Sequence, residues 1–157
     1  MPVTRRRITR SGVKPIQKQR PAYQSCYLYE AVEPETGERF LLERESLDSD
    51  GFQKFLDGFS TRFSESLSVL VPDNGRFHEA KKLTIPENVR LVFLSPYSPE
   101  LNPVERFWED PKDHVAFHLH KTLPALRQRV RRRLASYTDE AAASLTGYDY
   151  LLDAASA

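Results

Sequence analysis

Hydrophobic runs along the chain alternate with turn-forming residues, and their spacing predicts the order of strands and helices. The runs 26–32 (CYLYEAV) and 39–43 (RFLLE) are rich in aromatic and aliphatic residues, and a turn with Pro and Gly at 34–37 separates them. Two such runs around a short turn predict a β-hairpin. The runs 66–71 (SLSVLV) and 89–94 (VRLVFL) are short and apolar, so they predict two buried strands.

Apolar residues at helical spacing predict helices between and after these strands. After Ser49, where Ser or Asp can cap a helix, four phenylalanines fall at core-facing positions: Phe52, Phe55, Phe59 and Phe63. Residues 76–83 suit a short helix, and helical character resumes at Val104. A basic amphipathic helix over 122–136 then precedes an Ala-rich helix over 139–155. Strands that alternate with helices predict an α/β protein with a mixed sheet covered by helices.

Charge is distributed in blocks, which the formal net charge of +1 conceals. Residues 1–20 carry seven Lys and Arg and no acid, residues 121–133 carry six and no acid, and residues 21–120 carry a net charge of −8. Clustered arginines on a tail and on one helix are typical of proteins that contact nucleic acid. Basic runs also occur on helix faces that only meet solvent.

Length and cysteine content exclude several classes of protein. The 157 residues suffice for one domain with a core, but not for two catalytic domains. The single Cys26 excludes an internal disulfide and a multi-cysteine zinc site, which favours a reducing, cytosolic setting. No signal peptide is visible, and no run approaches the roughly 20 apolar residues of a membrane span. We expect a soluble, cytoplasmic protein with no membrane partner.

Two acidic residues stand where a sheet of this kind presents its ligands. Asp73 directly follows an apolar strand, and ligands of open α/β sheets collect beyond the carboxyl ends of strands. Asp-Asn-Gly is equally a favoured turn sequence. Glu105 lies three residues after Asn102, a good N-cap, with Pro103 at the first helical position, so it can also serve as a capping carboxylate.

The 31 residues between Asp73 and Glu105 suffice for a helix, a strand and a loop that return the chain to the same sheet edge. Two carboxylates at one point repel each other unless a cation lies between them, and Mg²⁺ or Mn²⁺ prefers such oxygen ligands. Two such ions, roughly 4 Å apart, can clamp the attacking and leaving oxygens of a phosphodiester. The two acids together indicate metal-dependent phosphodiester cleavage or transfer.

Two motifs around these acids resemble a known family. The run 73–78 (DNGRFH) and the run 94–108 (LSPYSPELNPVERFW) resemble the second and third acidic motifs of DDE transposases of the mariner superfamily, of the bacterial insertion-sequence-630 type. The resemblance covers about residues 23–120. It implies a ribonuclease H-like fold in which the first strand of this chain corresponds to the second strand of the fold. It also implies DNA transposition, with Mg²⁺ or Mn²⁺ as cofactor.

The resemblance assigns roles to individual residues. Asp73 and Glu105 correspond to the second and third catalytic, metal-binding acids, with Asn74, His78, Asn102 and Trp108 as supporting residues. For His78 a plain position on a helix face stays an alternative. We expect the DNA-binding side chains on the basic helix: Arg127, Arg131, Arg132 and Arg133. Pro111 is expected to kink or end the helix that begins at Pro103.

The family's first catalytic Asp has no counterpart at the start of the chain. Residues 1–22 contain no Asp or Glu, and the first acid is Glu30, inside a predicted strand. The sequence therefore predicts an N-terminally truncated chain with the first strand missing, a gap in the sheet, and an incomplete two-ion site. It predicts a basic extended lead-in at 1–22, a partial catalytic domain at 23–120, and C-terminal helices at 121–157.

Three functions follow from these observations. The first is a transposase catalytic-domain fragment that acts on double-stranded DNA, at transposon ends and target, as a possible homodimer in the bacterial nucleoid. The second is a catalytically inactive, DNA-binding remnant that lacks the first catalytic Asp. The third is a ribonuclease H-like nuclease in which Glu30 or another acid substitutes. A metal site at His114, His118 and His120 is a further alternative to a solvated helix face, without any accompanying zinc motif.

Overall fold

The computed structural model describes residues 26–72, 83–93, 102–116, 118, 120 and 122–156. Its strands are β1 (Tyr27–Val32), β2 (Arg39–Arg44), β3 (Ser68–Leu70) and β4 (Val89–Leu91). Its helices are α1 (Ser49–Arg62), α2 (Pro103–Ala116), α3 (Leu123–Ala135), α4 (Asp139–Thr146) and α5 (Asp149–Ser156). The mixed α/β class is confirmed. The helix predicted over 76–83 falls outside the described residues except at its last position, Leu83, which is not helical.

Strands β1 and β2 form the predicted antiparallel hairpin, in a register that pairs Tyr27 with Arg44 and Val32 with Arg39. At its turn Gly37 has a φ of 78° and its N–H donates to the carbonyl of Glu33 at 2.8 Å. A Cβ built on Gly37 would lie 1.8 Å from the carbonyl oxygen of Asp139. Only glycine suits this position, because the conformation is left-handed and the start of α4 packs directly against it.

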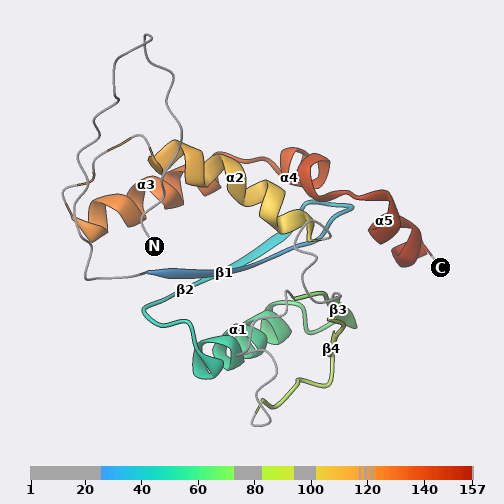
Figure 1. Ribbon diagram of the computed structural model, residues 1–157. Coiled ribbons are helices and arrows are strands. Elements are labelled where there is room, and N and C mark those ends of the chain that lie inside the picture. The colour runs from blue at the N-terminus through green and yellow to red at the C-terminus, as the bar shows by residue number, and fades with distance from the viewer. Residues whose placement is uncertain are drawn as a thin grey trace.

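The hairpin separates two hydrophobic cores, because successive side chains of a strand point to opposite faces. Tyr29 and Ala31 of β1 pack against α1, whereas Leu28 and Val32 pack against the second core, which α2, α3 and α4 build. Figure 1 shows these three layers, with α1 on one side of the hairpin and α2–α4 on the other.

The first core is built around one face of α1. Phe52, Phe55 and Phe59 are buried as predicted, and Phe63 packs against them at the end of the helix. The N-cap is Asp48, one residue earlier than the sequence pattern indicated, and its carboxylate accepts from the N–H of Gly51 at 2.7 Å. Burial of each phenylalanine stabilises the fold by about 1.5–3 kcal/mol, so this face dominates the attachment of α1.

Strands β3 and β4 form a parallel pair that is attached to α1. The amide of Asn88, next to β4, donates to the carbonyls of Ser60 and Phe63 at 3.2 and 3.0 Å. The described strands therefore form two sheets of two strands, because no described strand pairs with both β1 and β3. The sequence predicted a mixed sheet with a gap where a first strand is missing.

Two expectations about where helices end are corrected. Helix α2 does not end at Pro111 but continues to Ala116, with the proline fully buried. The predicted Ala-rich helix is two helices, because α4 ends at Gly147, whose N–H donates to the carbonyl of Ala143 at 2.7 Å. The Gly147 backbone also lies against the hairpin turn, with the Pro34 carbonyl oxygen 3.2 Å from the position of a built Cβ.

Glu30 is the one carboxylate of β1, and it lies on the face of the hairpin that the second core covers. Its side chain is 2% exposed, Oε1 is 4.0 Å from Nη1 of Arg39, and Oε2 has no hydrogen-bond partner within the described part of the chain. Arg39 donates instead to the carbonyls of Leu134 and Tyr137, at 3.1 and 3.3 Å. Burial raises the pKa of Glu30 to about 7, although Arg39 opposes this shift.

This buried carboxyl makes the stability of the fold depend on pH. Between the ordinary pKa and about 7, the folded state binds more protons than the unfolded state, so stability falls as pH rises through this window. We expect Glu30→Gln to raise the free energy of unfolding at pH 8 by up to about 3 kcal/mol, and to change it little at pH 4.5. Urea unfolding at both pH values measures this difference.

The matched control is Glu35→Gln, at an exposed position of the hairpin turn. It should leave the free energy of unfolding unchanged at both pH values. Equal stability of Glu30→Gln and the parent chain at pH 8 would contradict the prediction.

Candidate functional site

Glu105 lies in the first turn of α2, where Asn102 fixes the start of the helix. The carboxamide oxygen of Asn102 accepts from the N–H of Val104, and its backbone carbonyl accepts from the N–H of Glu105, both at 3.1 Å. Pro103 is buried at the first helical position, so the predicted cap is confirmed. The Glu105 side chain is 52% exposed, and Oε2 is 3.4 Å from Nζ of Lys112. Glu105 thus presents an accessible carboxylate to solvent.

The face of α2 beneath Glu105 is anchored in the second core. Phe107 is fully buried together with Leu134 of α3 and Ala142 of α4, and Trp108 packs against this cluster while half-buried. The rings of Phe107 and Trp108 meet edge to face, with centroids 6.5 Å apart. Trp108 therefore supports the helix from its inner side.

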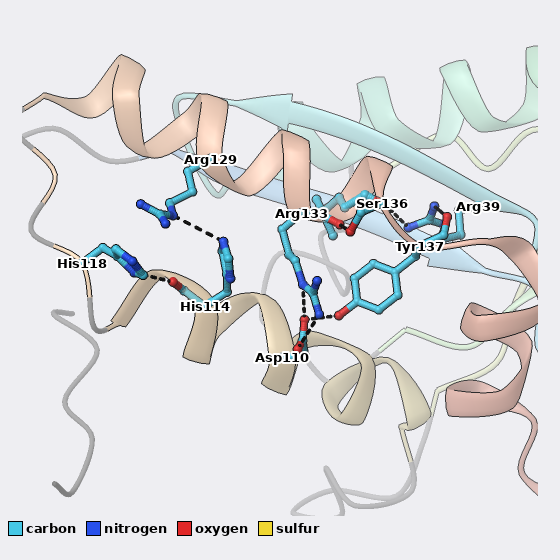
Figure 2. A network of polar contacts seen from close by, with 9 residues as sticks. Arg39, Asp110, His114, His118, Arg129, Arg133, Ser136 and Tyr137 are labelled. Carbon is cyan, nitrogen blue, oxygen red and sulfur yellow. Dashed lines mark hydrogen bonds and ion pairs between the residues drawn. The ribbon is translucent and has the colours of Figure 1, made fainter.

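A polar network joins α2 to α3 and to the turn that follows it (Figure 2). Asp110 of α2 accepts from Nε and Nη2 of Arg133 at 2.6 and 2.8 Å, and also from the hydroxyl of Tyr137. Arg39 of β2 lies over the rings of Phe107 and Tyr137, 5.5 and 6.0 Å from their centroids. The network thus connects the sheet, α2 and α3 at one point.

The hydrogen bonds of this network shift the pKa values of Asp110 and Tyr137. The bonds from Arg133, and then that from Tyr137, hold the pKa of Asp110 below its usual range. Burial and the bond to Asp110 raise the pKa of Tyr137 to about 12. Near neutral pH the network therefore holds a carboxylate, a guanidinium and a neutral phenol, which is the protonation state that satisfies all three hydrogen bonds.

The predicted DNA-binding arginines of α3 have different surroundings. Nε of Arg127 is 2.9 Å from Oε1 of Glu43, and Arg131 donates to Oε2 of the same carboxylate. Arg133 is bound to Asp110 as described above, and Arg132 is exposed. Sequence reasoning missed Glu43 and Asp110 as partners, because no local pattern links acids at positions 43 and 110 to a helix near residue 130.

The other predicted site residues stand as follows. Asp73, Asn74 and His78 lie outside the described residues. Glu30, the candidate substitute acid, is enclosed in the second core, whereas the carboxylate of Glu105 is open to solvent. Within the described ranges, no group of three or more His, Cys, Asp and Glu side chains is arranged to hold a metal ion.

None of the described helices is long and apolar enough to cross a membrane.

Comparison with known proteins identifies the family. A family model for DDE superfamily endonucleases matches residues 1–127. The chain belongs to the DDE superfamily endonucleases. A relative from Sinorhizobium fredii (strain NBRC 101917 / NGR234), the uncharacterized protein y4pE/y4sA, is 35% identical over 90 residues, which cover 57% of this chain and 67% of the relative. No solved structure matches the chain.

The family match includes both motifs that carry the predicted site residues. The DDE match includes the hairpin, α1, both acidic motifs and α2, and it extends into α3. It also includes residues 1–22, which the sequence pattern set apart as a lead-in. Enzymes of this superfamily generally use divalent metal ions and act on DNA, so an exposed carboxylate at Glu105 has the chemistry that the family needs.

Asp110 is expected to contribute to the attachment of α2 to α3. Asp110→Asn should lower the free energy of unfolding by about 1–2 kcal/mol, because the amide loses the charge-assisted bonds from Arg133 while both groups remain partly screened by water. Thermal unfolding followed by circular dichroism measures the change. Glu109→Gln, the same type of change at the preceding, exposed position of α2, is the control and should have no effect; an equal loss in both variants would refute the role of Asp110.

Proposed function

We propose that this chain is the catalytic part of a DDE transposase of the mariner superfamily, of the insertion-sequence-630 type. Its activity would be metal-dependent DNA cleavage followed by strand transfer at transposon ends and target. The observation that carries this proposal is the run 94–108, whose acid Glu105 lies exposed in the first turn of a helix that Asn102 caps. The family match over residues 1–127 supports it.

The order of the elements supports a ribonuclease H-like fold for this chain. An antiparallel hairpin, a helix, a parallel strand pair and further helices follow one another as this fold requires from its second strand onward. In that fold a further central strand would pair with β1 on one side and with β3 on the other. The two strand pairs of this structure both pack against α1, as they would on either side of such a strand.

Asp73 and Glu105 would hold the metal ions, with Asn74 and His78 nearby. Carboxylate oxygens are the ligands that Mg²⁺ and Mn²⁺ prefer, and the exposed carboxylate of Glu105 fits such an ion. When bound, such ions activate the attacking oxygen and stabilise the leaving oxygen in phosphoryl transfer.

The residues around Glu105 position its carboxylate. Asn102 fixes the first helical turn, and the buried Phe107 sets the rotation of α2, so that Glu105 stays on the solvent side. Lys112 holds the carboxylate through an exposed ion pair at 3.4 Å, which is weak enough for a metal ion to displace.

A second candidate is a DNA-binding chain without catalytic activity. Residues 1–29 contain no Asp or Glu, and Glu30 is enclosed in the second core. Both facts leave Asp73 and Glu105 without an accessible third acid from β1 or from the residues before it. Either candidate would bind double-stranded DNA, could form a homodimer, and would act at the bacterial nucleoid.

A cleavage assay tests the first candidate. The purified chain is incubated with a nicked or transposon-end duplex in Mg²⁺ or Mn²⁺, and we expect metal-dependent cleavage that Glu105→Gln reduces by at least about 100-fold. Glu109→Gln, an exposed acid one turn further along α2, is the control and should cleave normally. The binding of Mn²⁺, followed by electron paramagnetic resonance, should weaken in the first variant only.

The two candidates give opposite results in this assay. Salt-sensitive DNA binding without any cleavage, in either metal, would refute the transposase activity and support the inactive DNA-binding chain. Absence of both cleavage and binding would refute both.

A further inference from the structure

The five arginines of α3 fall into two groups according to the partner that holds each side chain. Three contact carboxylates, and these are Arg127 and Arg131 with Glu43 and Arg133 with Asp110. The remaining two, Arg129 and Arg132, have no carboxylate partner in the part of the chain that the structure describes. Neither guanidinium is therefore held in an ion pair with a described acid.

Arg129 is oriented by a histidine rather than by an acid. Its Nε–H donates to Nε2 of His114, across the interface of α3 and α2, at 3.3 Å (Figure 2). Since a guanidinium can only donate, Nε2 of His114 is the acceptor in this contact. The contact fixes the direction of the guanidinium but leaves its positive charge uncompensated.

The surroundings of this contact favour an anion over a metal cation. The ring of His118 lies 5.9 Å from that of His114, and the ring of His120 lies 6.4 Å from that of His118. Nδ1 of His118 is 3.0 Å from the carbonyl oxygen of His114, so this nitrogen carries the proton. A metal ion at the histidines would have to displace the guanidinium from His114 and would be repelled by its charge. This argues against the alternative of a histidine metal site.

Arg129 and Arg132 are three residues apart, which makes them neighbours on the surface of α3. Two like charges at this spacing repel each other and weaken a helix unless an anion lies between them. Arginine binds phosphate groups well, because its planar group of N–H donors matches their oxygens. The pair therefore has the chemistry of a phosphate-binding surface.

We propose that Arg129 and Arg132 bind phosphate groups of the DNA backbone, with His114 as the positioning residue for Arg129. This rests on the proposed function, in which DNA is the substrate. His114 is nine positions after Glu105, which places the two residues on opposite faces of α2. The surface therefore holds a segment of DNA away from the bond that reacts.

Binding of a labelled duplex tests this surface in the full chain. Fluorescence anisotropy with a 30-base-pair duplex, at a series of NaCl concentrations, gives the affinity and its salt dependence. We expect Arg129→Gln and Arg132→Gln each to weaken binding about fivefold at low salt and to reduce the salt slope by about 0.9, as the loss of one phosphate contact requires. Arg131→Gln, which removes the same charge from an arginine held by Glu43, is the matched control and should weaken binding less than about twofold.

Two substitutions of His114 test its role as the positioning residue for Arg129. His114→Ala should weaken DNA binding as Arg129→Gln does, whereas His114→Gln, whose amide oxygen can still accept from Arg129, should restore the affinity. Far-ultraviolet circular dichroism shows which variants are folded, and inorganic phosphate as a competitor shows whether a free anion occupies the same surface.

The outcomes separate the two proposals. If the parent chain binds DNA but Arg129→Gln, Arg132→Gln and Arg131→Gln weaken binding equally, the phosphate surface is refuted while the proposed function stands. If the parent chain binds no duplex at any salt concentration, both are refuted. A loss confined to Arg129→Gln, Arg132→Gln and His114→Ala supports the surface.

Discussion

The position of α2, and with it that of Glu105, depends on the packing of Phe107 and on the bonds between Asp110 and Arg133. Phe107 is fully buried among Leu134 and Ala142, and such burial contributes about 1.5–3 kcal/mol. The ion pair is partly exposed, so it contributes less energy, but two parallel hydrogen bonds fix the rotation of one helix against the other. Hydrophobic packing therefore holds the helices together, while the polar network sets their direction.

The hairpin connects this arrangement to the rest of the fold, because its two faces belong to different cores. One face packs against the phenylalanines of α1, and the other against α2, α3 and α4. Arg39 lies on the second face, where it stacks on Phe107 and donates to the carbonyls of Leu134 and Tyr137. Those bonds occupy the guanidinium of Arg39, so Arg39 compensates Glu30 incompletely. The Glu30 carboxyl, with its pKa raised to about 7, is therefore neutral at mildly acidic pH, where a surface glutamate is charged. One arginine thus stabilises the junction of the helices and leaves a buried acid partly unsatisfied.

The basic character of α3 has two physical origins in this fold. Arg127, Arg131 and Arg133 point toward acids of the sheet and of α2, so part of the positive charge serves the attachment of the helix. Arg129 contacts His114 instead, and Arg132 is exposed. A count of arginines cannot separate these groups, because both occur within one short run of sequence. The proposed DNA contact is accordingly narrower than the basic run, and it includes Arg129, which the sequence pattern did not single out.

The sequence alone determined the hairpin, the phenylalanine face of α1, the cap at Asn102 and the resemblance to DDE enzymes, since each depends on residues close together in the chain. Alternation, helical spacing and turn residues are local properties, and they act before any distant segment is in place. It left open whether Pro111 kinks or ends its helix, and it did not predict that Gly147 divides the last helix. Only the tertiary structure decided which acids neutralise which arginines, and that Glu30 is enclosed while Glu105 is exposed. These outcomes depend on contacts between positions as distant as 43 and 131, whose distance is set by the packing of whole elements rather than by any neighbouring residue.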